Sequence, residues 1–405
     1  MTTIAILATL DTKGAEAAYI KDQIELLGGQ ACLFDMGVVG QPGTTPDVTR
    51  DEIAEAGGLP LADILAAPTR QDASPIFIAG TTRILHAKLK AGEIDGVLAL
   101  GGTQGTSNAS QVMQALPYGL PKIMVSTMAS GDTSAFVGIK DITMMPSVGD
   151  ILGLNPVTRK ILSNAAGAAW GMAQSTASIE PADPSKPTIG MTNLGVLTEG
   201  SMHAIDRFRD KGYEVIVFHA VGSGGLAMEQ MMREGLIGAV FDYSLAEVAD
   251  QQFDALRAAD DSRLTTAGEM GLPQVLVPGG LEHVGLLVSA NTVPERWAGR
   301  QHVFHNPIIL APRLNAAELA QVAEAICERL VHTQGQCVFA MPMGGTSRYS
   351  IEGGPLHDPE GDAAFLAAIR THLPKSVELI VSEHAAEDDA FVDLCVDRLV
   401  DLIEG

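Results

Sequence analysis

The stretch "FHAVGSGGLAMEQ", Phe218–Gln230, decides the fold because it changes character twice over a short distance. The apolar residues that lead into it end at His219, three glycines follow, and apolar residues then recur at helical spacing. A buried strand that breaks into glycines and restarts as a helix is typical of a parallel α/β sheet. The same order recurs in "DGVLALGG", Asp95–Gly102, and in "PKIMVSTMASGD", 121–132. Strands that alternate with helices predict mostly parallel sheets covered by helices on both faces.

The length of the chain and one proline-rich stretch indicate two domains. At 405 residues the chain is long for a single core. The stretch "IEPADPSKPT", 179–188, carries three prolines and is typical of a linker. Strand and helix patterns continue after it, with strands expected at Gln274–Val277, Pro307–Leu310 and Gln336–Met341. We therefore expect two α/β domains, at 1–180 and 186–405.

Composition and charge argue against several classes of protein. Hydrophobic residues make up 46% and charged residues 19% of the chain, as in globular proteins with ordinary cores. A net charge of −23 argues against binding to nucleic acid or to an anionic membrane surface. The four cysteines form no CxxC pair, so they fit a reducing, cytoplasmic compartment better than a zinc or redox site. No apolar run has the length of a membrane span, and the amino terminus reads as a first strand rather than a signal peptide.

Three small-residue loops of the first half follow predicted strands, at Thr9–Gly14, Gly101–Thr106 and Ser126–Asp132. In parallel α/β sheets, ligands bind beyond the carboxyl ends of the strands. Glycines let a backbone approach an anion, and the first amides of a following helix attract phosphate. None of the three loops is a Walker A or a GxGxxG motif, and each could also be a plain tight turn or helix cap. In the first loop, Lys13 would balance phosphate charge and Asp11 would hold Mg²⁺ through water.

The second half carries the titratable candidates. His219, Glu282 and His283 all follow predicted strands. Imidazole beside a carboxylate suits general acid–base catalysis and also divalent-metal binding, although the usual spacing of metal ligands is absent. A hydrogen-bonded structural role for each histidine is the alternative. For a second ligand we expect an anion-accepting turn and a clamp from the residues Gly222, Gly224, Gly225, Gly344, Gly345, Ser347 and Arg348.

Taken together, these motifs resemble the UPF0261 family, also called Tm-1-like ATP-binding proteins. The resemblance rests on "ATLDTKG", "GGTQGT", "NAAGAAWGM", "FHAVGSGGLAME", "HNPIILAPR" and "MPMGGTSRYSIEGGPLHDPEGD", which occur in order along most of the chain. It implies two Rossmann-like domains, with ATP bound in the amino-terminal one. Nucleotide contacts are carried over to Thr9, Asp11, Lys13, Gly101, Gly102, Thr103, Gly105, Thr106, Ser130 and Gly131. The chain departs from the pattern at Glu282 and His283, where an aspartate followed by an apolar residue is expected.

Three functional hypotheses remain open at this point. The first is a cytoplasmic enzyme that binds ATP, alone or with Mg²⁺, and a second small molecule in a cleft between the domains, near His219. The second is a non-catalytic sensor or interaction protein for which ATP is a regulatory ligand, and the third is an enzyme similar to the nucleotide-sugar epimerases. The small-residue face of 155–174 allows close helix packing, either within one chain or in a homodimer.

Overall fold

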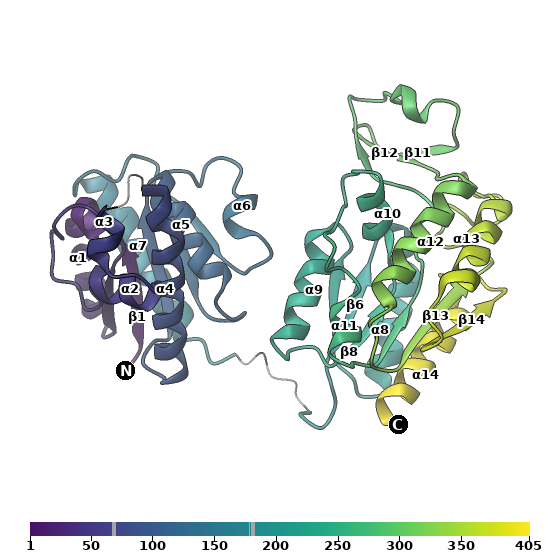
Figure 1. The fold of residues 1–405 in the computed structure, drawn as a ribbon, viewed down its shortest axis with the longest axis horizontal. Helices are drawn as coiled ribbons and strands as arrows, with labels where there is room; N and C mark the ends of the chain where they lie inside the picture. The colour runs from purple at the N-terminus through teal and green to yellow at the C-terminus, as the bar shows by residue number, and fades with distance from the viewer. Residues whose placement is uncertain (67–69, 178, 180–182) are drawn as a thin grey trace. The chain divides into compact units, whose positions relative to one another are not determined.

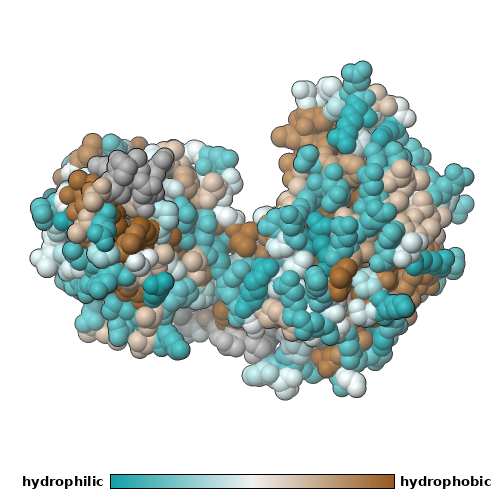
Figure 2. Space-filling view, viewed as in Figure 1, coloured by the Kyte–Doolittle hydropathy of each residue, from teal (hydrophilic) through white to brown (hydrophobic). Residues whose placement is uncertain are grey.

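The structure, a computed structural model, describes residues 1–66, 70–177, 179 and 183–405. The chain divides into two units, Met1–Ser178 and Ile179–Gly405 (Figure 1). Residues 180–182 of the expected linker lie outside the described residues. Each unit is an α/β structure with a parallel sheet flanked by helices, which confirms the predicted Rossmann-like fold class. Hydrophilic side chains cover most of the visible surface of both units (Figure 2).

The first unit is built on one five-stranded parallel sheet in the order β2-β1-β3-β4-β5. Its elements are β1 Thr3–Ala8, α1 Leu10–Leu26, β2 Gln30–Asp35, α2 Arg50–Gly57, α3 Leu61–Ala66, α4 Arg70–Lys90, β3 Gly96–Gly101, α5 Thr103–Gln114, β4 Lys122–Ser126, α6 Ser134–Val137, β5 Thr143–Pro146 and α7 Pro156–Ala173. Alternate side chains of each strand enter different cores. Ala5 and Leu7 face one core with residues of α2, α4 and α5, while Ile4 and Ile6 face the other with α1 and α7.

The small-residue face of α7 is used within the chain. Ala165, Ala166 and Ala169 are buried in the core that α7 shares with α1. The Ser163 and Tyr19 hydroxyls also lie 2.9 Å apart across these two helices. Small side chains let the helices approach closely, so packing inside one chain accounts for this face, and a homodimer stays a prediction.

The second unit repeats the plan of the first with a six-stranded parallel sheet in the order β14-β13-β9-β8-β6-β7. When the strands of this sheet are numbered from β6 and read from the β7 edge, their order starts second, first, third, fourth, as it does in the first unit. The elements of its first half are β6 Ile189–Asn193, α8 Thr198–Asp210, β7 Val215–His219, α9 Ser223–Arg233, β8 Ala239–Asp242, α10 Ala246–Gln252, α11 Thr266–Glu269 and β9 Gln274–Leu276. The remaining strands of this sheet and the helices beside them are α12 Ala316–Leu330, β13 Cys337–Pro342, α13 Pro359–His372, β14 Val377–Ser382 and α14 Asp389–Glu404.

A small antiparallel sheet is inserted between β9 and α12. It consists of β10 Leu286–Leu287, β12 Ile309–Pro312 and β11 His302–Asn306, in that order. The expected strand Pro307–Leu310 corresponds to β12, so it belongs to this insertion rather than to the main sheet. Figure 1 shows the insertion projecting from the second unit. None of the helices in the described parts of the chain is long and apolar enough to cross a membrane.

Candidate functional site

A cavity of about 350 Å³ lies at the carboxyl edge of the first sheet, beside the ends of β1, β2 and β3. In this sheet β1 and β3 are neighbours whose following connections run in opposite directions, which is the usual ligand position in such folds. The cavity is lined by Thr9, Asp11, Thr12, Lys13, Met36, Gly37, Val38, Val39, Ser74, Gly102, Thr103, Gln104, Gly105, Asn108 and Leu152. The set is polar at the helix ends and apolar along the loop after β2.

Two helices begin at this cavity. Thr9 is the N-cap of α1 and Gly102 is the N-cap of α5, and neither residue supplies a side-chain capping bond. At α1 the first amide, that of Leu10, instead donates to Asp35 Oδ1 over 3.1 Å. The first amides of α5 have no capping side chain, and amides at this position carry partial positive charge that suits an anion. The fold does not need glycine at two of these positions, because a methyl group added at Gly102 or Gly105 would meet no atom closer than 3.8 Å. Their small size therefore keeps the cavity open rather than allowing the helix to pack.

Two charged side chains line the cavity, and each already makes one internal contact. The Asp11 carboxylate accepts a bond of 3.3 Å from the Gly40 amide. Lys13, which is buried, has non-helical backbone angles inside α1 and donates from its ammonium group to the Ile151 carbonyl. The amino group is thus held by Ile151, and binding an anion directly would require it to leave that carbonyl.

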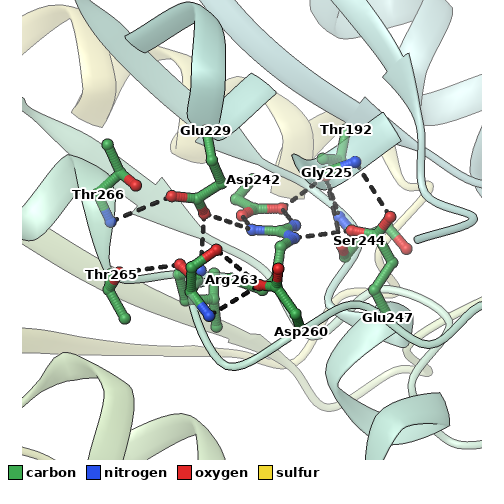
Figure 3. Close-up of polar contacts among 12 residues, drawn as sticks. Thr192, Gly225, Glu229, Asp242, Ser244, Glu247, Asp260, Arg263, Thr265 and Thr266 are labelled. Carbon is green, nitrogen blue, oxygen red and sulfur yellow. Dashed lines mark hydrogen bonds and ion pairs between the residues drawn. The ribbon is translucent and has the colours of Figure 1, made fainter. Parts of the chain in front are cut away.

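The glycine turn after β7 encloses a carboxylate of the protein itself. The amides of Gly222 and Gly225 donate to Glu247 Oε1 over 2.6 and 3.1 Å (Figure 3). A methyl group added at Gly225 would lie 2.0 Å from Glu247 Oε2 and 2.3 Å from Arg263 Nε. Glycine is required here because a buried ion pair passes directly over the backbone.

Arg263 is the centre of that buried network. Its guanidinium is fully buried and contacts three carboxylates: two 2.5 and 2.7 Å bonds to Asp242, one of 2.7 Å to Glu247 and a 3.5 Å contact to Glu229 (Figure 3). Burial disfavours its charge, but these carboxylates outweigh burial and raise the pKa of Arg263 well above its ordinary value. Burial also raises the pKa of Glu247, against the influence of Arg263. The network joins β8, α9 and α10 and leaves no open anion site in the turn.

A second cavity, of about 380 Å³, lies within the second unit. Its polar lining consists of His219, Arg257, His283 and His305, and its apolar lining of Leu194, Val196, Val221, Leu256, Ile309 and Ala311, with Tyr349. His219 is exposed and its Nδ1 lies 3.2 Å from the Asn193 carbonyl oxygen. His283 is buried, and its ring lies 5.9 Å from that of Tyr349. The small antiparallel sheet supplies one wall of this cavity.

Glu282 and His283 form a buried pair behind this cavity. His283 Nδ1 lies 2.9 Å from Glu282 Oε1, the Thr346 hydroxyl donates to Glu282 Oε2 over 2.8 Å, and the Ser347 hydroxyl donates to Oε1. Burial raises the pKa of Glu282, but the electrostatic interaction with His283, the bonds from His283 and Ser347 and the Arg313 guanidinium outweigh burial and lower this pKa to about 2. Glu282 is therefore a carboxylate at neutral pH and can hold a proton on Nδ1 of the imidazole.

Arg257 faces the other nitrogen of His283. Its Nη1 lies 3.4 Å from His283 Nε2, and its Nη2 donates to the His283 carbonyl over 2.8 Å. Asp250 holds the guanidinium in place through bonds of 3.0 Å to Nε and 2.8 Å to Nη2, and it also accepts from the Gly285 amide. The result is an imidazole held at both ring nitrogens, in a residue that lines the cavity together with Arg257.

Two family models together cover nearly the whole chain. The N-terminal domain model of the uncharacterised protein family UPF0261 matches residues 2–178, and the C-terminal domain model of the same family matches residues 186–403. The chain belongs to the UPF0261 family. A UPF0261 protein of Clostridium tetani is 38% identical over 402 residues, which are 99% of each chain.

The comparisons also include two further relatives and a solved structure with lower identity. A UPF0261 protein of Rhizobium meliloti is 37% identical over 93% of this chain and 92% of its own. The ToMV resistance protein Tm-1(GCR237) of Solanum lycopersicum is 29% identical over 98% of this chain but only 55% of its own length. UDP-N-acetylglucosamine 2-epimerase of Rickettsia bellii covers 70% of this chain, and 82% of its own, with 11% identity and a TM-score of 0.23. A superposition this loose says nothing about the reaction of this UPF0261 protein.

The ten nucleotide contacts implied by UPF0261 membership fall into three groups. Six line the first cavity: Thr9, Asp11, Lys13, Gly102, Thr103 and Gly105. Gly101 and Thr106 lie beneath it, where Thr106 is buried and its hydroxyl lies 2.7 Å from that of Ser126. Ser130 and Gly131 are exposed in the loop after β4 and do not line the cavity. Asp11 and Lys13, expected in a loop, are in the first turn of α1, which begins five residues earlier than predicted.

The residues predicted for a second ligand mostly contact the protein itself. Gly224 lies so close to the His219 carbonyl that an added methyl would be 1.9 Å from its oxygen, and methyls added at Gly344 and Gly345 would lie 2.5 Å from Ala385 N and 2.8 Å from Ile351 N. The Ser347 hydroxyl donates to Glu282 Oε1, as described above. Arg348 donates to Glu387 over 3.1 and 2.9 Å, and this carboxylate raises its pKa. This geometry supports a packing role for the glycines and a paired role for Arg348.

Several cavity residues were missed from the sequence. In the first unit they are the loop after β2, Met36–Val39, together with Ser74, Asn108 and Leu152. The rule that ligands lie beyond strand ends, applied to β2 as well, would have found the loop. In the second unit they are Arg257 and Tyr349, which follow no predicted strand directly. In the described ranges no group of three or more His, Cys, Asp or Glu side chains is placed to hold a metal ion.

Proposed function

We propose that this UPF0261 protein binds ATP in the cavity of its first unit. The observation that carries the proposal is the convergence of two helix amino termini, those of α1 and α5, on one cavity at the carboxyl edge of the sheet. Backbone amides at such termini are suited to phosphate oxygens. The absence of side chains at Gly102 and Gly105 supports close approach of a phosphate, because the fold itself makes no use of either glycine.

The remaining lining suggests how the nucleotide would lie. Val39 and Leu152 are both more than half exposed at the cavity, and we propose that they cover the adenine ring. Asp11 would repel bare phosphates, so we propose that it contacts Mg²⁺ carried by the triphosphate, the usual arrangement for this ion. Lys13 lies in the same helical turn and would offset phosphate charge.

Titration calorimetry of the full chain tests this proposal. We expect ATP to bind more tightly with Mg²⁺ than without it, and Gly105→Val to weaken binding by about tenfold or more, since a side chain would block one phosphate position. Gly131→Val is the matched control from the same edge of the sheet and should bind as the wild type does. Equal affinity of the wild type and Gly105→Val would place the nucleotide elsewhere. Asp11→Asn should remove most of the advantage given by Mg²⁺.

An enzyme acting on a small molecule is favoured over a nucleotide sensor by the second cavity. A buried carboxylate beside an imidazole that lines a cavity is suited to proton transfer. Binding of ATP in the first unit does not require such a pair in the second. Incubation of the protein with ATP and a metabolite extract, followed by mass spectrometry, tests this choice. We expect at least one compound to be consumed, and His283→Gln to abolish its consumption. A protein that binds ATP and consumes nothing would be a sensor.

A further inference from the structure

The cavity of the second unit joins an apolar surface to a small polar end. Leu194, Val196, Leu256 and Ile309 contribute apolar side chains, and the polar end consists of His283 and Arg257. The volume of about 380 Å³ lies in the range of small-molecule sites. A ligand that fills it must therefore be mostly apolar, with its polar atoms at one end.

The charges at the polar end already have partners. Arg257 is 6% exposed, and Asp250 binds two of its nitrogens. Glu282 is paired with His283 and lies in the field of Arg313. A ligand carboxylate would have to compete with Asp250, and a ligand ammonium would meet the guanidinium. An isolated extra charge is costly in a buried site, so this polar end favours an uncharged ligand.

The protonation of His283 follows from its two partners. Glu282 is a carboxylate and can only accept, so Nδ1 carries the proton. A guanidinium can only donate, so the Nε2 that Arg257 Nη1 approaches carries the lone pair. In this form the lone pair of His283, a residue that lines the cavity, is on Nε2.

From this arrangement we propose that the cavity binds an uncharged organic molecule with an apolar body and a hydroxyl or carbonyl oxygen, and that His283 accepts a proton from it. The proton leaves the hydroxyl, or the carbon next to the carbonyl, and bonds to Nε2, while its electron pair remains on the ligand and leaves the oxygen negative. Arg257 Nη1, which the structure places 3.4 Å from Nε2, no longer has an acceptor there once Nε2 is protonated and donates to this oxyanion instead, and the Glu282 carboxylate balances the imidazolium. The proposal rests on the second-ligand part of the proposed function and is independent of nucleotide binding.

Three probes of the same shape test the charge of the ligand: benzamide, benzoate and benzamidine. Diethyl pyrocarbonate, which acylates unprotonated imidazole nitrogen, reports whether His283 is covered, and mass spectrometry of the peptides gives its rate in the full chain. We expect benzamide at about 20 mM to slow modification of His283 about threefold, because a nine-atom fragment binds with a Kd of about 10 mM. Benzoate and benzamidine should have little effect. His372, an exposed histidine that does not line the cavity, is the internal control.

Each other outcome overturns the proposal. Stronger protection by benzoate would identify an anion site, and stronger protection by benzamidine a cation site. No protection by any probe, or no reaction at His283, would show that Nε2 is not available to ligands. Leu256→Trp should narrow the mouth and abolish protection, and because Leu256 is 51% exposed the variant should fold. The assay contains no nucleotide, so failure of ATP to bind would leave its result unchanged.

Glu282 is a positioning residue in this proposal, and a spectroscopic readout distinguishes that role from a structural one. Nitrogen NMR shifts of the imidazole report which nitrogen carries the proton. We expect the Nδ1–H form of His283 in the wild type and a mixture of both forms in Glu282→Gln, whose amide must also satisfy Thr346 and Ser347. An unchanged tautomer in a folded Glu282→Gln would remove Glu282 from the mechanism.

Discussion

At the scale of single residues, Glu282 gives the protein a measurable response to acid. Its pKa is about 2 in the folded protein, against an ordinary value of 4.5. The stabilisation is therefore present above about pH 4.5 and is lost as the pH falls through 4.5 toward 2. Between pH 5 and pH 2 we expect the wild type to lose about 3 kcal/mol more of its free energy of unfolding than Glu282→Gln. Urea denaturation of both proteins across this range measures the difference, and parallel losses would contradict it.

Replacement of Gly225 should lower the stability of the protein directly. A methyl group there would lie 2.0 Å from Glu247 Oε2, inside a fully buried network that cannot move aside. We expect Gly225→Ala to lower the free energy of unfolding by about 2 kcal/mol or more. Gly195→Ala is the control, because a methyl there meets nothing within 4 Å, and its effect should stay within about 0.5 kcal/mol. Chemical denaturation compares the two variants, and equal stabilities would be inconsistent with the close approach.

The chemistry of single residues was only partly predictable. The glycine turn was expected to accept an anion, and the amides of Gly222 and Gly225 do donate to a carboxylate. The carboxylate belongs to Glu247, on the helix that follows the next strand. A glycine pattern identifies free amides, but it does not say whether a ligand or a distant side chain of the same chain will reach them. Arg263 was missed for the same reason, since its three partners come from separate elements.

At the scale of elements, Arg263 ties a loop to β8, α9 and α10. Its removal would leave Asp242, Glu247 and Glu229 buried together without a cation. Because breaking a buried pair leaves uncompensated charge, we expect Arg263→Met to destabilise the protein by about 3–5 kcal/mol. The exposed pair Arg209–Asp206 offers the control, and Arg209→Met should change stability by less than about 1 kcal/mol. Thermal unfolding would contradict this view if the two variants behaved alike.

Long, strongly apolar elements could be predicted from the sequence, and short or marginal ones could not. The missed strands include β5, four residues at a sheet edge, and β14, an edge strand with partly exposed positions. Most positions of β5 and β14 are exposed or only partly buried, so their apolar signal is weak. β8 is fully buried but only four residues long, too short to be separated from the helical patterns beside it. The start of α1 was placed too late because Lys13 and Gly14 interrupt the helical pattern.

At the scale of the whole molecule, each unit has its own sheet and its own hydrophobic cores. We therefore expect residues 1–178 and 183–405 to fold when they are produced separately. Mg²⁺ with ATP should raise the melting temperature of the first fragment alone, and benzamide that of the second alone. Differential scanning fluorimetry measures both. A fragment that stays unfolded would show that its cores are not sufficient by themselves.

The overall plan was the most predictable property of the chain. Repeated segments of strand, glycine turn and helix predict parallel sheets. The proline-rich stretch 179–188 predicts that there are two such sheets, in separate domains. The shared strand order of the two sheets could not be predicted, because parallel strands of similar composition can be exchanged without changing the pattern of apolar residues. The two cavities depended on that order, since it decides which loops become neighbours.

The enclosed carboxylate of Glu247 has a consequence for how the two halves can be compared. Both sheets share a strand order, yet the glycine turn after β7 in the second is filled by a carboxylate of the chain itself, whereas the start of α5 in the first has no capping side chain. The substitution Glu247→Ala would remove this carboxylate and leave a space beside the buried guanidinium of Arg263. Formate or acetate added from outside would then be able to take the vacated place, so the second half would acquire an anion site of the kind that we propose for the first half.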